Sequence, residues 1–138
     1  MIKLLDLLKE DNPFVSRGGE KRAENFYKNK IQQYVKDGMK GDLDLSNSLI
    51  TSLPDELTKV GGDLYLSFTK ITSLPNNLTV GGDLDLSLTN IISLPSELRV
   101  GGNLYLLATP LSEKYSEKEI RAMVPNVNGG IIIKYSQI

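Results

Sequence analysis

Aspartate and tyrosine side chains recur at intervals of 20 or 21 residues through the middle of the chain. They alternate with leucines, and this period of two places them on one side of a β-strand. Across successive copies they form two rows. The first row is Asp42, Asp63, Asp83 and Asn103, and the second is Asp44, Tyr65, Asp85 and Tyr105. Carboxylates and phenols in rows can exchange protons, hold a cation or form a recognition surface.

Several kinds of chemistry are excluded by the composition. The chain has no cysteine and no histidine, so it has no thiolate nucleophile, no imidazole base and neither of the two ligands on which most zinc sites depend. A calcium loop of the D-x-D-x-D-G type is absent, and the glycine pairs lack the G-K-[ST] of a phosphate loop. Two carboxylates on an open sheet have no pocket that would raise the pKa of an acid. We therefore expect a protein with no catalytic residues, no metal and no cofactor.

The two rows favour different interpretations. Like charges that face each other across neighbouring strands are unfavourable by a few tenths to about 1 kcal/mol per pair. The first row is therefore explained either by aspartates that cap backbone amides or by a charged surface selected for binding. Tyrosines in the second row, with Phe68 and Leu88 nearby, favour recognition. The predicted partner-binding residues are Asp42, Asp44, Asp63, Tyr65, Phe68, Asp83, Asp85, Leu88, Tyr105 and Leu107.

These side chains lie within three copies of one phrase, which begin at Gly41, Gly62 and Gly82, and a fourth partial copy begins at Gly102. Self-similarity at this period is typical of a solenoid, in which each unit buries its apolar side only by stacking on its neighbours. Leucines of the D-L-x-L stretch and of the I-x-x-L-P-x-x-L stretch supply the core, and the glycine pairs supply the corners. The sequence predicts an α/β repeat solenoid with parallel strands and a cap at each end.

The repeated pattern L-x-L-x-x-[TS]-x-I-x-S-L-P-x-x-L resembles the leucine-rich repeat over residues 42–111. The TSLP and ISLP turns are similar to those of secreted bacterial effectors, and the GDLYLS…TSLP sequence is similar to small leucine-rich proteins of phages and prophages. The resemblance implies a short leucine-rich-repeat stack whose two rows lie on the concave side. The asparagine usual in that family is replaced here by hydroxyl residues, which are Ser48, Thr69, Thr89 and Thr109.

The flanking segments are predicted to be caps, so that residues 1–40, 41–111 and 112–138 are three parts of one structural domain. Helices are expected over residues 2–10 and 20–37, the second with Gly38 as its C-cap. After Leu111 we expect a helix that begins near Ser112 or Ser116 and ends before Pro125. A strand over residues 131–135, with Ile131 and Ile133 in the core, is expected to close the sheet.

Charge is distributed unevenly along the chain. Residues 41–103 carry three Lys or Arg against eight Asp or Glu, whereas residues 1–40 carry nine against six. The acidic repeats predict a protein partner with a basic surface. The alternative is a nucleic-acid-associated protein whose basic helix makes the contact, and its contact residues are Arg17, Lys21, Arg22, Lys28 and Lys30.

The resemblance to phage proteins implies a sharper hypothesis, in which the acidic surface inhibits a nucleic-acid-binding host defence nuclease by imitating phosphates. No signal peptide and no long apolar stretch is recognisable in the sequence, so we expect no membrane partner and a location in the cytoplasm of a bacterial host. Self-association through the C-terminal strand is a further alternative, and it would make the protein a homo-oligomer.

Overall fold

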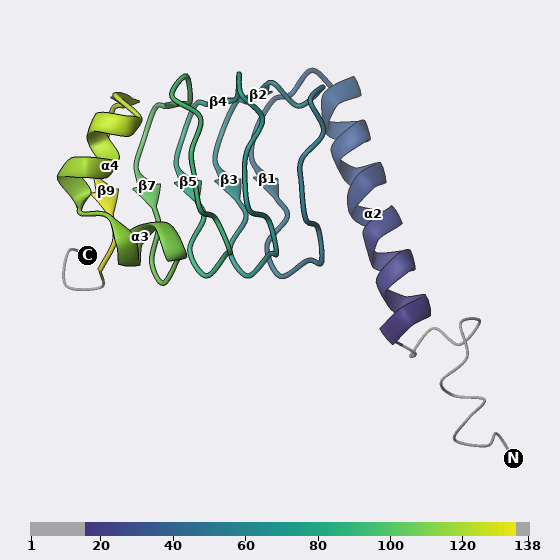
Figure 1. Cartoon of the computed structure of the whole chain (residues 1–138). Helices are drawn as coiled ribbons and strands as arrows, with labels where there is room; N and C mark the ends of the chain where they lie inside the picture. The colour runs from purple at the N-terminus through teal and green to yellow at the C-terminus, as the bar shows by residue number, and fades with distance from the viewer. Residues whose placement is uncertain (1–15, 135–138) are drawn as a thin grey trace, which may run out of the picture.

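The protein is a stack of short parallel turns with a helix at one end and two helices with a strand at the other (Figure 1). The computed structural model describes the backbone of residues 16–134 and the side chains of residues 25–134. The expected helix at residues 2–10 lies outside the described residues. Within them the chain is a β-solenoid with repeats of about 20 residues, as the sequence predicted.

One strand from each turn joins a five-stranded parallel sheet in the order β1-β3-β5-β7-β9. Each strand pairs with the next in the register that the repeats define, so that Leu64 lies beside Leu84 and Tyr65 beside Asp85. The strands are β1 Leu43–Asp44, β3 Leu64–Tyr65, β5 Leu84–Asp85, β7 Leu104–Tyr105 and β9 Ile131–Ile132. Because the register is kept, equivalent side chains of successive turns form continuous rows.

A second parallel sheet, which the sequence did not indicate, lies on the far side of the glycine corner in the order β2-β4-β6-β8. Each of its strands has two residues, of which only one points inward. Such a short strand produces no alternating pattern in the sequence. Val60, Val80 and Val100 are these inward residues and are buried. The strands are β2 Lys59–Val60, β4 Thr79–Val80, β6 Arg99–Val100 and β8 Asn126–Val127.

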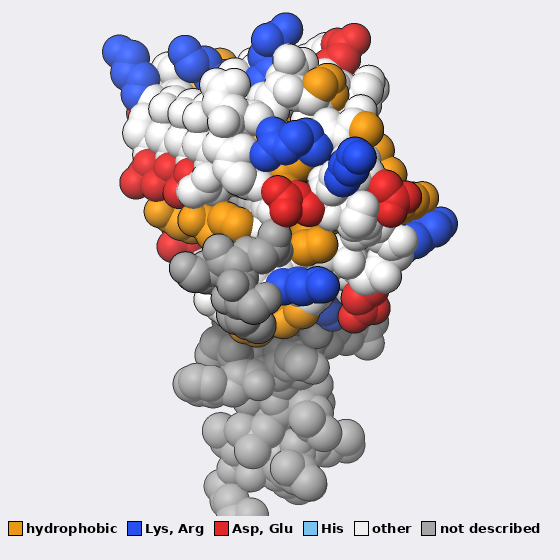
Figure 2. All heavy atoms as spheres, turned by 90° about the vertical axis from the view of Figure 1, so that its left-hand side faces the viewer, with side chains coloured by type: hydrophobic (Ala, Val, Ile, Leu, Met, Phe, Trp, Pro, Cys, Tyr) orange, Lys and Arg blue, Asp and Glu red, His pale blue; other side chains and the backbone are white. Residues whose placement is uncertain are grey.

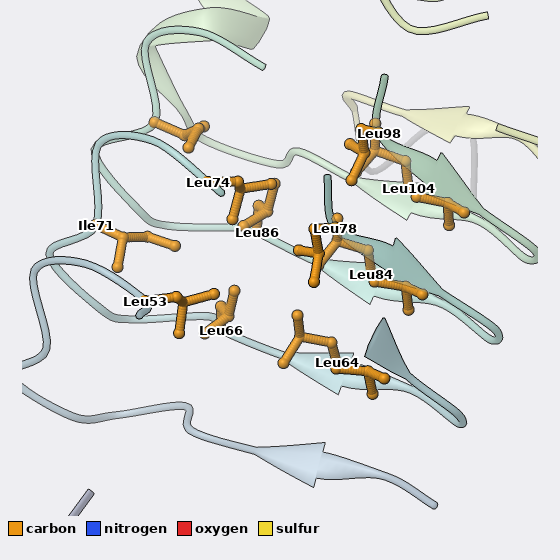
Figure 3. Packing of buried hydrophobic residues seen from close by; sticks show 14 of the residues in the cluster. Leu53, Leu64, Leu66, Ile71, Leu74, Leu78, Leu84, Leu86, Leu98 and Leu104 are labelled. Atoms are coloured by element: carbon orange, nitrogen blue, oxygen red, sulfur yellow. The ribbon is translucent and has the colours of Figure 1, made fainter. Parts of the chain in front are cut away.

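The core is a column of leucine and isoleucine side chains between the five-stranded sheet and the return leg of each turn (Figure 3). Leu64, Leu66, Leu84 and Leu86 are fully buried. Nearly all the leucines and isoleucines predicted to be inward are buried, and Leu94 and Ile133 are half-buried at the edge of the column. Burial of such side chains contributes about 1.5–3 kcal/mol each, so the column is the main source of stability.

Buried hydroxyls occupy the position at which the leucine-rich-repeat pattern has asparagine. Each one donates to the carbonyl three residues earlier in its own turn, as Thr69 Oγ1 does to Leu66 O at 2.8 Å and Thr89 Oγ1 to Leu86 O at 2.7 Å. Ser48 and Thr109 make the same bond. These hydrogen bonds close each turn on itself, and the links between turns are made elsewhere.

Helix α2 (Ser16–Lys36) covers the first turn and satisfies backbone groups at its open edge (Figure 1). The Tyr34 hydroxyl donates to Gly41 O at 2.7 Å and accepts the N–H of Gly61 at 3.2 Å. Lys30 Nζ donates to Asp44 O at 2.6 Å. The helix begins four residues earlier than expected, through a glycine pair that costs about 1 kcal/mol per residue but does not forbid a helix. Gly38, with φ of 92°, ends it as predicted.

The C-terminal cap has two short helices, α3 (Pro110–Lys114) and α4 (Glu117–Met123), where the sequence predicted one. Each begins with a capping box, the first from Thr109 and the second, as predicted, from Ser116. The Arg121 guanidinium donates to Val127 O at 3.0 Å and Gly129 O at 2.7 Å. It thereby satisfies carbonyls of the last corner, and β9 closes the five-stranded sheet.

Candidate functional site

The first row of acidic residues is a hydrogen-bonded ladder that links one turn to the next. Asp42 Oδ1 accepts the N–H of Asp63, Asp63 Oδ1 accepts the N–H of Asp83, and Asp83 Oδ1 accepts the N–H of Asn103, each at 2.7 Å. Asn103 Oδ1 continues the series with the N–H of Gly130 at 2.8 Å. The capping interpretation therefore holds for this row.

The second glycine of each corner makes room for this ladder. A Cβ at Gly62, Gly82 or Gly102 would lie 2.0–2.1 Å from the Oδ1 atom of the aspartate one turn earlier. A Cβ at that distance would force the carboxylate to move, so the glycine is what allows the hydrogen bond to form. The repeated G-G-D is thus one structural unit, in which a carboxylate crosses over a bare backbone to reach the next amide.

Two tyrosines lie half-buried beside this ladder and are held by it. The Tyr65 hydroxyl donates to Asp63 Oδ2 at 2.9 Å, and the Tyr105 hydroxyl accepts from Asn103 Nδ2 at 3.3 Å. The bond to Asp63 and the charge of the neighbouring aspartates raise the pKa of Tyr65 to about 12. Both phenol rings are therefore fixed in orientation before any partner arrives.

The raised pKa of Tyr65 predicts a change of stability at alkaline pH. The folded protein holds this proton more tightly than the unfolded chain, whose tyrosine pKa is 10.0. The stabilisation is complete below pH 10 and is lost as the pH rises toward about 12. We expect Asp63→Asn to bring the titration of Tyr65, followed by absorbance at 295 nm against a Tyr65→Phe reference, back toward pH 10. An unchanged titration in Asp63→Asn would contradict the assigned cause.

The second row contains two aspartates with different surroundings. Asp44 Oδ1 accepts the N–H and the hydroxyl of Ser46, and these bonds, followed by the Lys30 ammonium, lower the pKa of Asp44. Asp85 Oδ1 accepts the N–H of Ser87 at 3.0 Å. Within residues 25–134 no cationic side chain is paired with Asp85. It is half-buried between Tyr65 and Tyr105 in the paired register.

A third column follows the strands, where the backbone turns, and adopts a left-handed conformation. The φ angles are 58° at Asn47, 57° at Phe68, 60° at Leu88 and 53° at Ala108. Asparagine tolerates this region, whereas bulky residues are rare there. Phe68 is nevertheless 57% exposed and Leu88 is 37% exposed. A large apolar side chain in this backbone is strained and gains little burial on folding. Asn47, at the equivalent position of the first turn, is a signal in the sequence for the left-handed backbone.

These observations define a surface that we call the ladder face. It combines the outward side of the five-stranded sheet, with Asp44, Tyr65, Asp85 and Tyr105, and the exposed apolar residues of the left-handed column, Phe68 and Leu88. In the view onto the C-terminal end, acidic side chains lie directly beside hydrophobic ones along the left flank (Figure 2). Leu107, which the sequence placed on this surface, is only 8% exposed and is buried. The first-row aspartates border the face.

The residues of the alternative basic site are only partly described. Arg17, Lys21 and Arg22 have side chains outside the described part of the structure. Lys28 is exposed on α2, and Lys30 contacts β1 through its bond to Asp44 O. Lys30 therefore has a capping role, which the sequence did not indicate.

A groove of about 630 Å³ lies between α2 and the first turn, away from the ladder face. Its lining includes Ile31 and Val35 of the helix and Ile50 and Pro54 of the return leg. Lys28, Lys36 and Glu56 also line it. The sequence predicted the helix but not the hollow, because the hollow depends on the angle at which the helix meets the stack.

No model of a known protein family matches the chain, and no curated protein matches its sequence. Among the described residues no helix is long and apolar enough to cross a membrane. In the same part of the chain, no three acidic side chains are close enough together to hold a metal ion.

Proposed function

We propose that this protein is a non-catalytic recognition protein that binds a partner protein through the ladder face. The observation that carries the proposal is the pair of exposed apolar residues, Phe68 and Leu88, in a left-handed backbone beside two fixed tyrosines. Neither position favours stability, since asparagine would fit the backbone better and would not expose an apolar surface. Tyrosine and other aromatic side chains are the residues that most often dominate binding energy in protein interfaces.

The charge of this surface indicates the chemistry of the partner. Asp44 and Asp85 lie within the face, and the first-row carboxylates of Asp42, Asp63 and Asp83 lie along its border. An arrangement of five negative charges favours a partner with a basic surface and speeds its association at low salt. The resemblance to short leucine-rich repeats of phages supports a narrower version, in which the row of carboxylates occupies the nucleic-acid groove of a host defence nuclease.

The competing proposal, nucleic-acid contact through α2, has less support from the described residues. Lys30 donates to the strand backbone, so its ammonium is already engaged at the cap. Residues 41–103, which form most of the stack, carry an excess of negative charge that would repel phosphates. Salt-dependent binding of DNA or RNA by the purified protein would support this alternative against the one proposed here.

A capture experiment with matched variants tests the proposal. The wild-type protein is immobilised beside a ladder-face variant (Asp44→Asn, Tyr65→Ser, Asp85→Asn, Tyr105→Ser) and a control variant of the other sheet (Lys59→Ser, Arg99→Ser). Bacterial lysate is passed over each, and retained proteins are identified by mass spectrometry. Lys59 and Arg99 are exposed on β2 and β6, so the control changes charge without touching the ladder face.

We expect one protein to be retained by the wild type and the control and lost from the ladder-face variant. Circular dichroism establishes that all three proteins are folded. Retention of the same partner by all three would place the binding site elsewhere, and loss from the control alone would move it to the second sheet.

A further inference from the structure

Three consecutive strands of the ladder face carry Tyr65, Asp85 and Tyr105 in register. Tyr65 pairs with Asp85, and Asp85 pairs with Tyr105. Neighbouring strands are about 4.8 Å apart, so the two tyrosines lie on either side of the carboxylate at roughly equal distances. We call this arrangement, an aspartate with a tyrosine on the neighbouring strand at each side, the slot.

The aspartate of this slot has an unused acceptor. Asp85 Oδ1 accepts the N–H of Ser87, whereas its second oxygen has no partner among the described residues. The rings beside it are held in place through the hydroxyls, by Asp63 on one side and Asn103 on the other. A half-buried carboxylate between two fixed rings is therefore arranged to receive a positive group without reorganisation.

Two turns earlier the chain places a cation near the equivalent aspartate, although this cation bonds the backbone carbonyl and not the carboxylate. Asp44 occupies the equivalent place in β1, and there the Lys30 ammonium of α2 lies against the strand, 2.6 Å from Asp44 O. The Lys30 charge also acts on the Asp44 carboxylate. A cation is thus supplied internally at the first aspartate of the row. Asp85 is the second, and within the described residues no cation is supplied to it.

We propose that the Tyr65–Asp85–Tyr105 slot binds an arginine side chain of the partner protein. This inference rests on the proposed function and names its central contact. A guanidinium above Asp85 would lie about 5 Å, one strand spacing, from the strand that carries each tyrosine. This is within the roughly 6 Å over which a cation and an aromatic ring attract each other. Arginine fits better than lysine, because its flat fork bonds a carboxylate with two N–H groups and stacks on aromatic faces.

The test uses a small probe and needs no knowledge of the partner. N-acetyl-arginine-amide is titrated into the full chain at constant ionic strength while the ring signals of Tyr65 and Tyr105 are followed by NMR. N-acetyl-lysine-amide is titrated in parallel. The matched variants are Asp85→Asn and Asp44→Asn, which remove the same charge from the same row. Asp85 has a tyrosine on each side, whereas Asp44 has Tyr65 on one side and Lys30 close by.

We expect the arginine probe to shift both tyrosine signals, with at least threefold weaker binding in Asp85→Asn and unchanged binding in Asp44→Asn. The lysine probe should bind at least threefold more weakly than the arginine probe. Absence of shifts, or equal weakening in the two variants, would overturn the slot. A partner captured equally by Asp85→Asn and wild type, yet lost from the ladder-face variant, would also overturn the slot and leave the proposed function intact.

Discussion

Replacement of Gly82 by alanine is expected to destabilise the protein by about 3 kcal/mol. The added methyl would lie 2.0 Å from Asp63 Oδ1 and 3.1 Å from the carbonyl carbon of Gly62. Gly82 is in a middle turn, so the backbone cannot move away without disturbing the turns on both sides. The Asp63 carboxylate must therefore leave the amide of Asp83 and the hydroxyl of Tyr65. The measurement is the free energy of unfolding from urea denaturation.

A double-mutant cycle separates the loss of the ladder from a general effect of the methyl group. Asp63→Ala alone is expected to cost about 2 kcal/mol, because it removes hydrogen bonds to a charged acceptor. In the pair Asp63→Ala with Gly82→Ala, the carboxylate no longer meets the methyl group and its hydrogen bonds are already lost. Only the approach of 3.1 Å to the carbonyl carbon of Gly62 remains. The double variant should therefore be no more than about 1 kcal/mol less stable than Asp63→Ala.

Gly130→Ala is the control, since a Cβ there has its nearest neighbour at 3.7 Å. It should change stability by less than about 0.5 kcal/mol. Additive costs in the cycle would show that Gly82 and Asp63 act independently.

Replacement of Phe68 by asparagine is expected to weaken partner binding at least about tenfold while the stability of the fold stays within about 1 kcal/mol of the wild type. The side chain is 57% exposed, so folding gains little from its burial. Asparagine relieves the strain of the left-handed backbone, and the chain already has Asn47 in the equivalent place of the preceding turn. Affinity for the captured partner and urea denaturation are measured on the same preparation.

The control for this variant is Ile92→Asn. Ile92 is 63% exposed on the return leg, so its replacement removes a similar amount of exposed apolar surface from another side of the turn. It should leave partner binding unchanged. Equal weakening by both variants would show that general surface hydrophobicity, and not the ladder face, determines binding. A large loss of stability in Phe68→Asn would assign Phe68 to the fold.

The repeat architecture was predictable because its determinants are local and recur in register. Leu64 and Leu84 alternate with polar residues, and prolines and glycines mark each return. The second sheet was not predictable, because a strand such as Thr79–Val80 has a single inward residue and no period. The corner geometry likewise depends on contacts between turns. A sequence shows that Gly82 is small, but not that the Asp63 carboxylate lies above it.

The candidate site was predictable only in part, for the same physical reason. The two rows of outward residues follow from alternation, and the structure places them in neighbouring strands as expected. Whether Asp63 caps an amide or faces solvent is decided by the next turn, 20 residues away in the chain. Phe68 and Leu88 have left-handed backbones that their own residue types do not predict, and Asn47 indicates this conformation only for the first turn. Leu107 occupies an outward position by alternation but is buried.

The pairing of a corner glycine with the side-chain oxygen of the preceding turn has a consequence for how such a chain can lengthen. Each 20-residue unit contains both parts of this link. Its corner glycine leaves room for the aspartate of the preceding turn, and its own aspartate accepts the amide of the next turn. Tandem duplication of a short stretch of gene therefore supplies a complete and compatible turn. The ladder face would lengthen by one strand with each added unit, and the turns already present would need no change to accept the new one.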